Sequence, residues 1–436
     1  MRTPMRGGMM TDGARVWAAT LLLLVAVSAG AQPAFQELLY DLQSPREATR
    51  VKAARAIALS GYPDAASALV PLLADRADAV QLEAIDALVG IALASAPGAN
   101  AANTFKRVRG SIAWSVFEAG PLAVLPRTWP PELLTSLAAA LRDEDEAVRS
   151  AAAGALAVIG SPAVSAPAAE TLKALSVDVI YALRSRDVHT REAVARAAGA
   201  IITPPPGAAV PVAIGDALIA ALNDAYPPVR AAAADALGWV REARAEQALR
   251  DRFAFFREGP DAESALHALA RMASPASAGV FRRALTSREA EYRLIGAEGL
   301  GRLRDRTALP VLSAMAERER DRSVLVATAF AFYLLGEHSN LQRLAEALLV
   351  PDVARQARAY LTELGAASAP ELHSWLQQND PALRKAVVEV LGLSGHAASE
   401  AALQQVARGD SDRGVAEAAR QALIRLRALP QGARTR

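Results

Sequence analysis

The 436-residue sequence contains no cysteine, and aromatic residues make up only 5% of it. Without cysteine the chain can form no disulfide, no thiolate nucleophile, no cysteine-ligated zinc site and no cysteine-linked lipid anchor. Its histidines show neither H-x-x-x-H nor H-E-x-x-H spacing, and no G-x-S-x-G motif is present. The sequence therefore predicts no metal site, no cofactor and no catalytic residue. The five histidines are His189, His267, His338, His373 and His396.

An excess of charge of one sign is also missing once the amino terminus is set aside. The whole chain has 48 basic and 46 acidic residues. Residues 1–31 contain three arginines and one aspartate, so 45 residues of each kind remain. We therefore expect no nucleic-acid partner, because such proteins usually present a basic face.

Residues 1–31 have the pattern of a signal peptide. Three arginines precede the apolar run 16–27, and Ala29-Gly30-Ala31 has the form of a cleavage site. The run is short for a membrane-spanning helix. We expect cleavage after Ala31 and a periplasmic or secreted protein, the alternative being an uncleaved inner-membrane anchor. Other possible starts of translation are Met5, Met9 and Met10.

The prominent feature is a repeated amphipathic stretch, clearest at residues 143–160. Apolar residues follow at helical spacing from Val148 to Ile159, acidic residues open the stretch, and Gly160 and Pro162 end it. Similar stretches recur every ~30–40 residues, a length that holds two helices per unit. The residue after the apolar opener falls at Arg149, Arg191, Arg230, Glu263, Arg293, Leu325, Arg355, Arg384 and Ala416.

The shared pattern D-x-x-x-[VL]-R-x-A-A-x-x-A-L-x-x-[LI]-G, seen best at 145–160 and 380–395, resembles the HEAT repeat in its short bacterial form. The resemblance implies an all-α fold, a right-handed α-solenoid (superhelix) of about eleven two-helix repeats. We expect N-terminal repeats over 32–94, the main array over 132–430 and a disordered tail at 431–436. This fold hosts many functions and by itself indicates none.

Residues 95–131 interrupt the period. The segment is either a degenerate repeat or an inserted loop that packs over the solenoid. It holds Phe105, Trp114, Phe117 and Trp129, in a chain with few aromatic residues. These aromatic side chains either anchor a partner or fill the gap in the repeat pattern. We take Trp114, Phe117, Trp129 and, in a later repeat, Trp239 as candidate partner-binding residues.

Recurrent aspartate and arginine residues are interpreted as structural. In families of this kind they tie turns and adjacent repeats together, and Asp145/Arg149, Asp187/Arg191 and Asp380/Arg384 are spaced as i, i+4 pairs. Exposed pairs of this type contribute only ~0–1 kcal/mol each. The structural positions are Asp145, Arg149, Arg191, Arg230, Arg293, Arg355, Asp380 and Arg384.

The sequence thus favours an exported, non-catalytic scaffold that binds another protein along its concave helical face. The resemblance also reaches two enzyme families with HEAT-like repeats, the phycobilin lyases and the alkylpurine DNA glycosylases. Both act in the cytoplasm, so the signal-peptide pattern argues against them. The alternative function is that of a lyase-like enzyme, an enzyme-accessory subunit, or a membrane-anchored adaptor.

Export gives the first testable prediction. The natural protein should begin at Gln32 and be soluble outside the cytoplasm, because signal peptidase removes residues 1–31. Mass spectrometry of the protein isolated from its own cells measures the terminus. A full-length cytoplasmic chain would contradict the prediction.

Overall fold

The computed structural model describes residues 35–60, 64–93, 129–160, 169–201 and 210–428. These residues form 22 α-helices with short 3-10 turns and contain no strand. The helices follow one another as eleven antiparallel pairs, which confirms the all-α repeat fold predicted from the sequence.

The first helices of the pairs are α2 (Phe35–Asp41), α4 (Ala65–Leu69), α8 (Leu133–Ala139), α10 (Ala169–Ala182), α12 (Val212–Ala221), α14 (Glu246–Phe256), α16 (Ala278–Ala284), α18 (Leu309–Ala316), α20 (Leu341–Ala347), α22 (Ala369–Trp375) and α24 (Glu400–Gly409). The second helices are α3 (Glu47–Ser60), α5 (Asp78–Leu93), α9 (Glu146–Ile159), α11 (Val188–Ile201), α13 (Pro227–Trp239), α15 (Pro260–Met272), α17 (Ala290–Arg302), α19 (Arg322–Leu334), α21 (Pro351–Leu364), α23 (Pro381–Ser394) and α25 (Arg413–Ala428).

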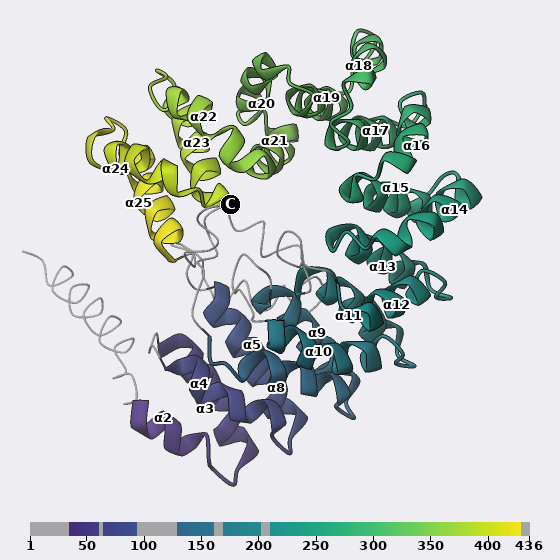
Figure 1. The fold of residues 1–436 in the computed structure, drawn as a ribbon. Helices are drawn as coiled ribbons and strands as arrows, with labels where there is room; N and C mark the ends of the chain where they lie inside the picture. The colour runs from purple at the N-terminus through teal and green to yellow at the C-terminus, as the bar shows by residue number, and fades with distance from the viewer. Residues whose placement is uncertain (1–34, 61–63, 94–128, 161–168, 202–209, 429–436) are drawn as a thin grey trace, which may run out of the picture.

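The pairs are arranged along a curved arc, which runs from α2 at the purple end to α25 at the yellow end (Figure 1). From α14 onwards the second helices lie on the inner side of the arc and the first helices on the outer side. Successive inner helices pack directly on one another, as α11 does on α13 and α17 on α19. The inner helices therefore form the concave surface of the solenoid.

The described helices continue across the irregular segment of the sequence. Helix α5 packs directly on α9, so the second and third pairs are neighbours in the stack. Most of the segment 95–131, including Phe105, Trp114 and Phe117, lies outside the described residues. The predicted signal segment 1–31 and the tail 431–436 also lie outside them. In the part of the chain that is described, no helix has the length and apolar character needed to cross a membrane.

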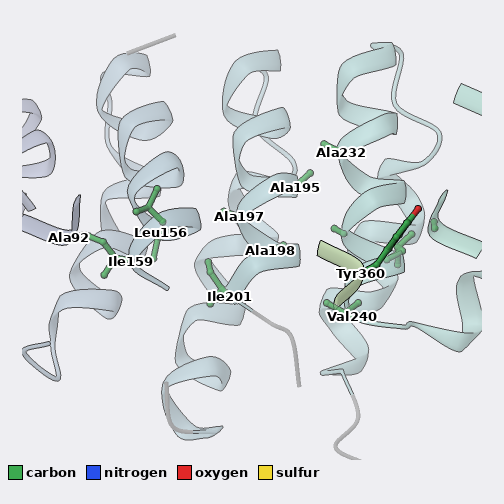
Figure 2. Close-up of a cluster of buried hydrophobic side chains, with 14 of the residues drawn as sticks. Ala92, Leu156, Ile159, Ala195, Ala197, Ala198, Ile201, Ala232, Val240 and Tyr360 are labelled. Atoms are coloured by element: carbon green, nitrogen blue, oxygen red, sulfur yellow. The ribbon is translucent and has the colours of Figure 1, made fainter. Parts of the chain in front are cut away.

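Small residues on the inner helices allow the close packing of successive repeats. A Cβ atom added at Gly238 of α13 would lie 2.7 Å from the Cα atom of Ala268 in α15. The same close approach joins Gly301 of α17 to Ala331 of α19, where the distance would be 2.6 Å. Larger apolar side chains fill the remaining space, as Figure 2 shows for Leu156 and its neighbours. The alanine-rich stripes of the sequence are therefore contact surfaces between helices.

Arginines near the start of inner helices connect neighbouring repeats, and we call this set of contacts the arginine ladder. In α11, Arg191 donates from Nη1 to the backbone carbonyl of Ser185, at 2.8 Å, in the turn before its own helix. Its Nε and Nη2 donate to both carboxylate oxygens of Asp224 in the next repeat, at 2.7 and 3.0 Å. The backbone carbonyl of Asp224 accepts from Arg230, which in turn binds Asp261 at 2.7 and 2.6 Å.

The same two-point contact recurs along the chain. It joins Arg50 to Asp75, Arg293 to Glu319, and Arg384 to Asp410. The hydrogen bonds from Arg293 lower the pKa of the Glu319 carboxyl to about 2. This contact therefore stays charged far into the acid range.

The partners within the ladder differ from those that the spacing of four residues indicated. Asp145 and Asp380 do not pair with the arginines four positions on; they cap helices α9 and α23 by accepting from the backbone N–H groups of Val148 and Ala382. Arg384 instead reaches the next repeat, and its side chain is 10% exposed. Asp145 and Asp380 therefore serve as helix caps. The arginines tie turns and adjacent repeats together, as expected, through acids of the next repeat. The contribution of ~0–1 kcal/mol expected above applies to solvent-exposed ion pairs. The side chains of Arg384 and Asp410 are largely buried, so that value does not apply to them.

Several positions interrupt the ladder. Arg149 donates to the backbone carbonyls of Asp143 and Glu144 and to the Thr190 hydroxyl, without a carboxylate. Arg355 is exposed and makes no ion pair within the described residues. The equivalent positions in α15 and α19 hold Glu263 and Leu325 in place of arginine.

The close approach of inner helices gives a second testable prediction. Gly238→Ala should destabilise the protein by about 1–3 kcal/mol, because the new methyl group has no space between α13 and α15. Gly409→Ala is the matched control, since nothing lies within 4 Å of its added Cβ, and it should be neutral or stabilising by up to ~1 kcal/mol. Thermal melting of both variants measures the difference. Equal melting temperatures would show that the two helices are not packed this closely.

Candidate functional site

The polar side chains of the central inner helices form one continuous surface, which we call the concave stripe. Each inner helix has other inner helices on both sides and its own outer helix behind it, so its exposed residues face the inside of the arc. Glu298 and Tyr360 are buried beneath this surface and contact the residues that form it. The concave stripe consists of Asp235 and Trp239 on α13, Glu263, His267 and Arg271 on α15, Glu291, Glu298 and Arg302 on α17, and Tyr360 and Glu363 on α21.

Trp239 is the aromatic residue of the concave stripe. It is 56% exposed, although it belongs to the last turn of a packed helix. The guanidinium of Arg271 lies over its ring, 4.5 Å from the centroid, and donates to Asp235 at 3.2 Å. The indole is therefore held in one orientation by a cation–π contact while much of its face remains open.

Glu263, His267 and Glu291 form a cluster of possible metal ligands in the middle of the stripe. The Nε2 atom of His267 lies 3.2 Å from Oε1 of Glu291 on the next inner helix. One ligand atom from each of the three residues lies within 4.8 Å of the other two. The surroundings are acidic. The pKa of the neighbouring Tyr292 hydroxyl is raised first by burial and then by the charges of Glu263, Glu258 and Glu289.

A second charged group follows along α17. Arg302 donates from Nε and Nη2 to both carboxylate oxygens of Glu363, each at 2.8 Å, and from Nη1 to Glu298 at 2.9 Å. Burial alone would raise the pKa of the Glu298 carboxyl, but the charge of Arg302 and the hydrogen bond from Tyr360 hold it below its usual range. Glu298 is therefore a buried carboxylate with a full set of partners.

Tyr360 connects α17 to α21 across the intervening inner helix. Its hydroxyl donates to Glu298 at 2.5 Å over a sequence separation of 62 residues. The ring is stacked on Phe330 of α19, with 4.3 Å between centroids and 12° between planes. Burial and the charge of Glu298 raise the pKa of the Tyr360 hydroxyl well above its ordinary value. Three successive repeats are thus joined at one point of the concave surface.

Trp129, the other sequence candidate that the structure describes, does not join the concave stripe. Trp129 is partly buried and packs against the hydrophobic core, and its indole nitrogen has no hydrogen-bond partner among the described residues. Trp129 therefore has the surroundings of a packed side chain rather than those of an exposed anchor. Trp114 and Phe117 lie outside the described residues.

An open crevice of about 950 Å³ lies elsewhere, where Tyr181 of α10 meets the ladder turns that precede α9 and α11. Arginines and acids line it in nearly equal number, and Arg142 both covers the Tyr181 ring and pairs with Asp178. Arg149 at its edge donates to backbone carbonyls. The concave stripe carries a largely exposed tryptophan and is the candidate developed below.

Sequence reasoning missed most of the concave stripe. A usable signal existed for Glu263 and His267, which are four residues apart and therefore share one face of a helix. The spacing of histidines alone does not reveal this pair, because one of its two members is a glutamate. No local signal connects Glu298 to Tyr360, because the contact spans two repeats.

The bond between Tyr360 and Glu298 gives the third prediction. Tyr360→Phe should lower the free energy of unfolding by about 1–3 kcal/mol. The buried Glu298 carboxylate would lose a hydrogen-bond donor that water cannot replace. Hydrogen exchange should show reduced protection in both α17 and α21. The exposed Tyr40 in the first repeat provides the control, and Tyr40→Phe should change stability by less than ~0.5 kcal/mol. Loss of protection in α21 alone would show that the contact does not link the two repeats.

Comparisons with known proteins agree with the repeat architecture. A family model described as HEAT repeats matches residues 340–424, which correspond to α20 through most of α25. No curated protein matches the chain significantly.

Similar solved structures include two engineered proteins and a natural complex. One engineered protein is 20% identical, with 90% of this chain and 98% of that chain covered and a TM-score of 0.36. The other is 25% identical over 62% of this chain and 96% of that chain, with a TM-score of 0.35. The complex of CpcE and CpcF of phycocyanin lyase from Nostoc sp. PCC7120 is 20% identical over 66% and 96%, with a TM-score of 0.31. The chain carries HEAT repeats, recognised at residues 340–424, and the preceding helix pairs have the same two-helix form.

Proposed function

We propose that the protein is a scaffold that binds a protein partner on its concave stripe, with Trp239 as the central anchor. The observation that carries the proposal is a tryptophan that is 56% exposed on the concave side and held by Arg271. Tryptophan is strongly enriched among the residues that dominate binding energy. A ring that is already oriented also loses little conformational freedom when a partner binds.

The charge of the concave stripe favours a partner with basic side chains. The stripe holds five carboxylates and two guanidinium groups, so it is net negative when His267 is neutral. This charge would repel the phosphate backbone of a nucleic acid. It would attract and orient a protein segment rich in lysine or arginine.

The location and wider role of the scaffold are part of the proposal. The signal-peptide pattern of residues 1–31 supports export, and retention of this segment would place the same scaffold at the inner membrane. An accessory subunit of an enzyme would use the concave stripe in the same way. The identity of the partner recovered in the following experiment distinguishes a pure scaffold from an enzyme-accessory subunit.

The fourth prediction tests the anchor. Trp239→Ala should weaken partner binding by at least ~2 kcal/mol, about 30-fold, because it removes the exposed anchor. The protein itself should lose no more than ~1 kcal/mol of stability, mainly the cation–π contact with Arg271. Affinity is measured against the partner isolated from an extract of the native cells, and stability by thermal melting of the same preparation.

Phe255→Ala is the matched control, because Phe255 is 80% exposed on the outer helix α14. This variant should bind the partner as the unaltered protein does. If both variants lose the partner equally, or neither does, the binding surface is not the concave stripe. Should Trp239→Ala instead unfold the protein, the proposal of an exposed anchor would be wrong.

A further inference from the structure

The cluster of Glu263, His267 and Glu291 is unusual among the charged contacts of this solenoid. Elsewhere on the inner helices, a carboxylate of one repeat faces an arginine of the neighbouring repeat, as Asp235 faces Arg271 and Glu389 faces Arg358. Here two carboxylates and an imidazole face one another, with ligand atoms within 4.8 Å. It is the one group of this kind in the part of the chain that the structure describes.

The composition of the cluster follows from a substitution in the repeat pattern. Glu263 occupies the position that holds the ladder arginine in α11 and α13. Among the described residues Glu263 forms no ion pair, whereas Glu291 pairs only with His267. Two carboxylates this close repel one another unless a positive charge lies between them. In place of the permanently charged arginine of α11 and α13, the cluster has only His267, whose charge depends on protonation.

The chemistry of the three side chains indicates which cation fits. One imidazole nitrogen and two carboxylates suit divalent transition metals such as Zn²⁺, whereas Mg²⁺ and Ca²⁺ prefer sites made of oxygen alone. With bonds of ~2.0–2.2 Å, the donors of a tetrahedral zinc site lie ~3.4 Å apart. The pair of His267 Nε2 and Glu291 Oε1, at 3.2 Å, already has this separation. Glu263 is exposed and close enough to complete the set by a change of side-chain rotamer.

The backbone supports the arrangement. Glu263 and His267 are four residues apart on α15, so both side chains project from one face of a continuous helix. Glu291 lies in the first turn of α17, which packs on α15. Ligands on rigid helices hold their positions better than ligands on loops.

We propose that Glu263, His267 and Glu291 bind one divalent transition-metal ion of the Zn²⁺ class on the concave surface. Three protein ligands leave the fourth position of a tetrahedral ion open. That position faces the inside of the arc, where water or a side chain of a bound protein completes it. The metal joins α15 to α17 in the place of a ladder arginine. This inference does not depend on Trp239 or on the proposed partner.

The fifth prediction tests the site with the metals alone, on the full chain without an affinity tag and after removal of bound metal. Titration with Zn²⁺ should give one equivalent of tight binding. Co²⁺ should occupy the same site and produce the visible d–d absorption of a low-coordinate ion. His267→Gln and Glu263→Gln should each weaken binding at least ~10-fold, because each removes one of three ligands. Circular dichroism shows that the variants are folded, and Glu291→Gln replaces any variant that is not.

His338→Gln is the matched control. His338 also lies beside a glutamate, with Nδ1 3.5 Å from Oε1 of Glu371, but that pair belongs to no three-residue cluster in the described residues. The control should bind Zn²⁺ as tightly as the unaltered protein. The proposal is overturned if no equivalent of Zn²⁺ binds below millimolar concentration. It is equally overturned if His338→Gln weakens binding as much as His267→Gln, or if Glu263→Gln leaves binding unchanged.

Discussion

The direct packing of successive inner helices is the constraint on which the stack of repeats depends, and an arginine contact between successive turns reinforces it at many of the junctions. One guanidinium satisfies the backbone carbonyls of its own turn and the carboxylate of the next, as Arg230 does with Asp224 and Asp261. Arginine suits this task because its planar fork can bind a carboxylate at two points while a further N–H group binds elsewhere. The contact fixes the offset between neighbouring helix pairs. The inner helices of neighbouring pairs also approach closely at residues such as Gly238.

The concave stripe arises where this regular scheme changes. The ladder position carries Glu263 in α15 and Leu325 in α19. Of the three successive inner helices α15, α17 and α19, only α17 therefore has a ladder arginine, Arg293. Other contacts take over in this region. Glu298 and Tyr360 join α17 to α21 directly, and Phe330 of α19 lies under the Tyr360 ring. These contacts across repeats bring the polar groups of the stripe together.

Function in such a fold depends on what the inner helices leave exposed. Most charged residues of the inner face are paired with a neighbour, as Arg302 is with Glu363, and such pairs contribute mainly to the stack. Trp239 and Glu263 are different, because one is a largely exposed aromatic ring and the other a carboxylate without an ion pair among the described residues. Exposed and incompletely satisfied groups are the ones that a partner or a metal ion can stabilise. The proposals for a protein partner and for a metal ion rest on these two residues.

The sequence by itself determined the class of fold, the two-helix form of the repeat and the ends of many helices. These features are local: apolar spacing such as that from Val148 to Ile159 selects a helix, and the side chain of Asp145 caps it by accepting from the backbone N–H of Val148. The tertiary structure alone decided which side chains meet across repeats. Arg384 finds Asp410 rather than Asp380, and Glu298 finds Tyr360 two repeats away, because the stacking offset sets these contacts. The spacing of residues within one helix does not specify this offset between helices. The sequence alone therefore did not show which residues come together in the concave site.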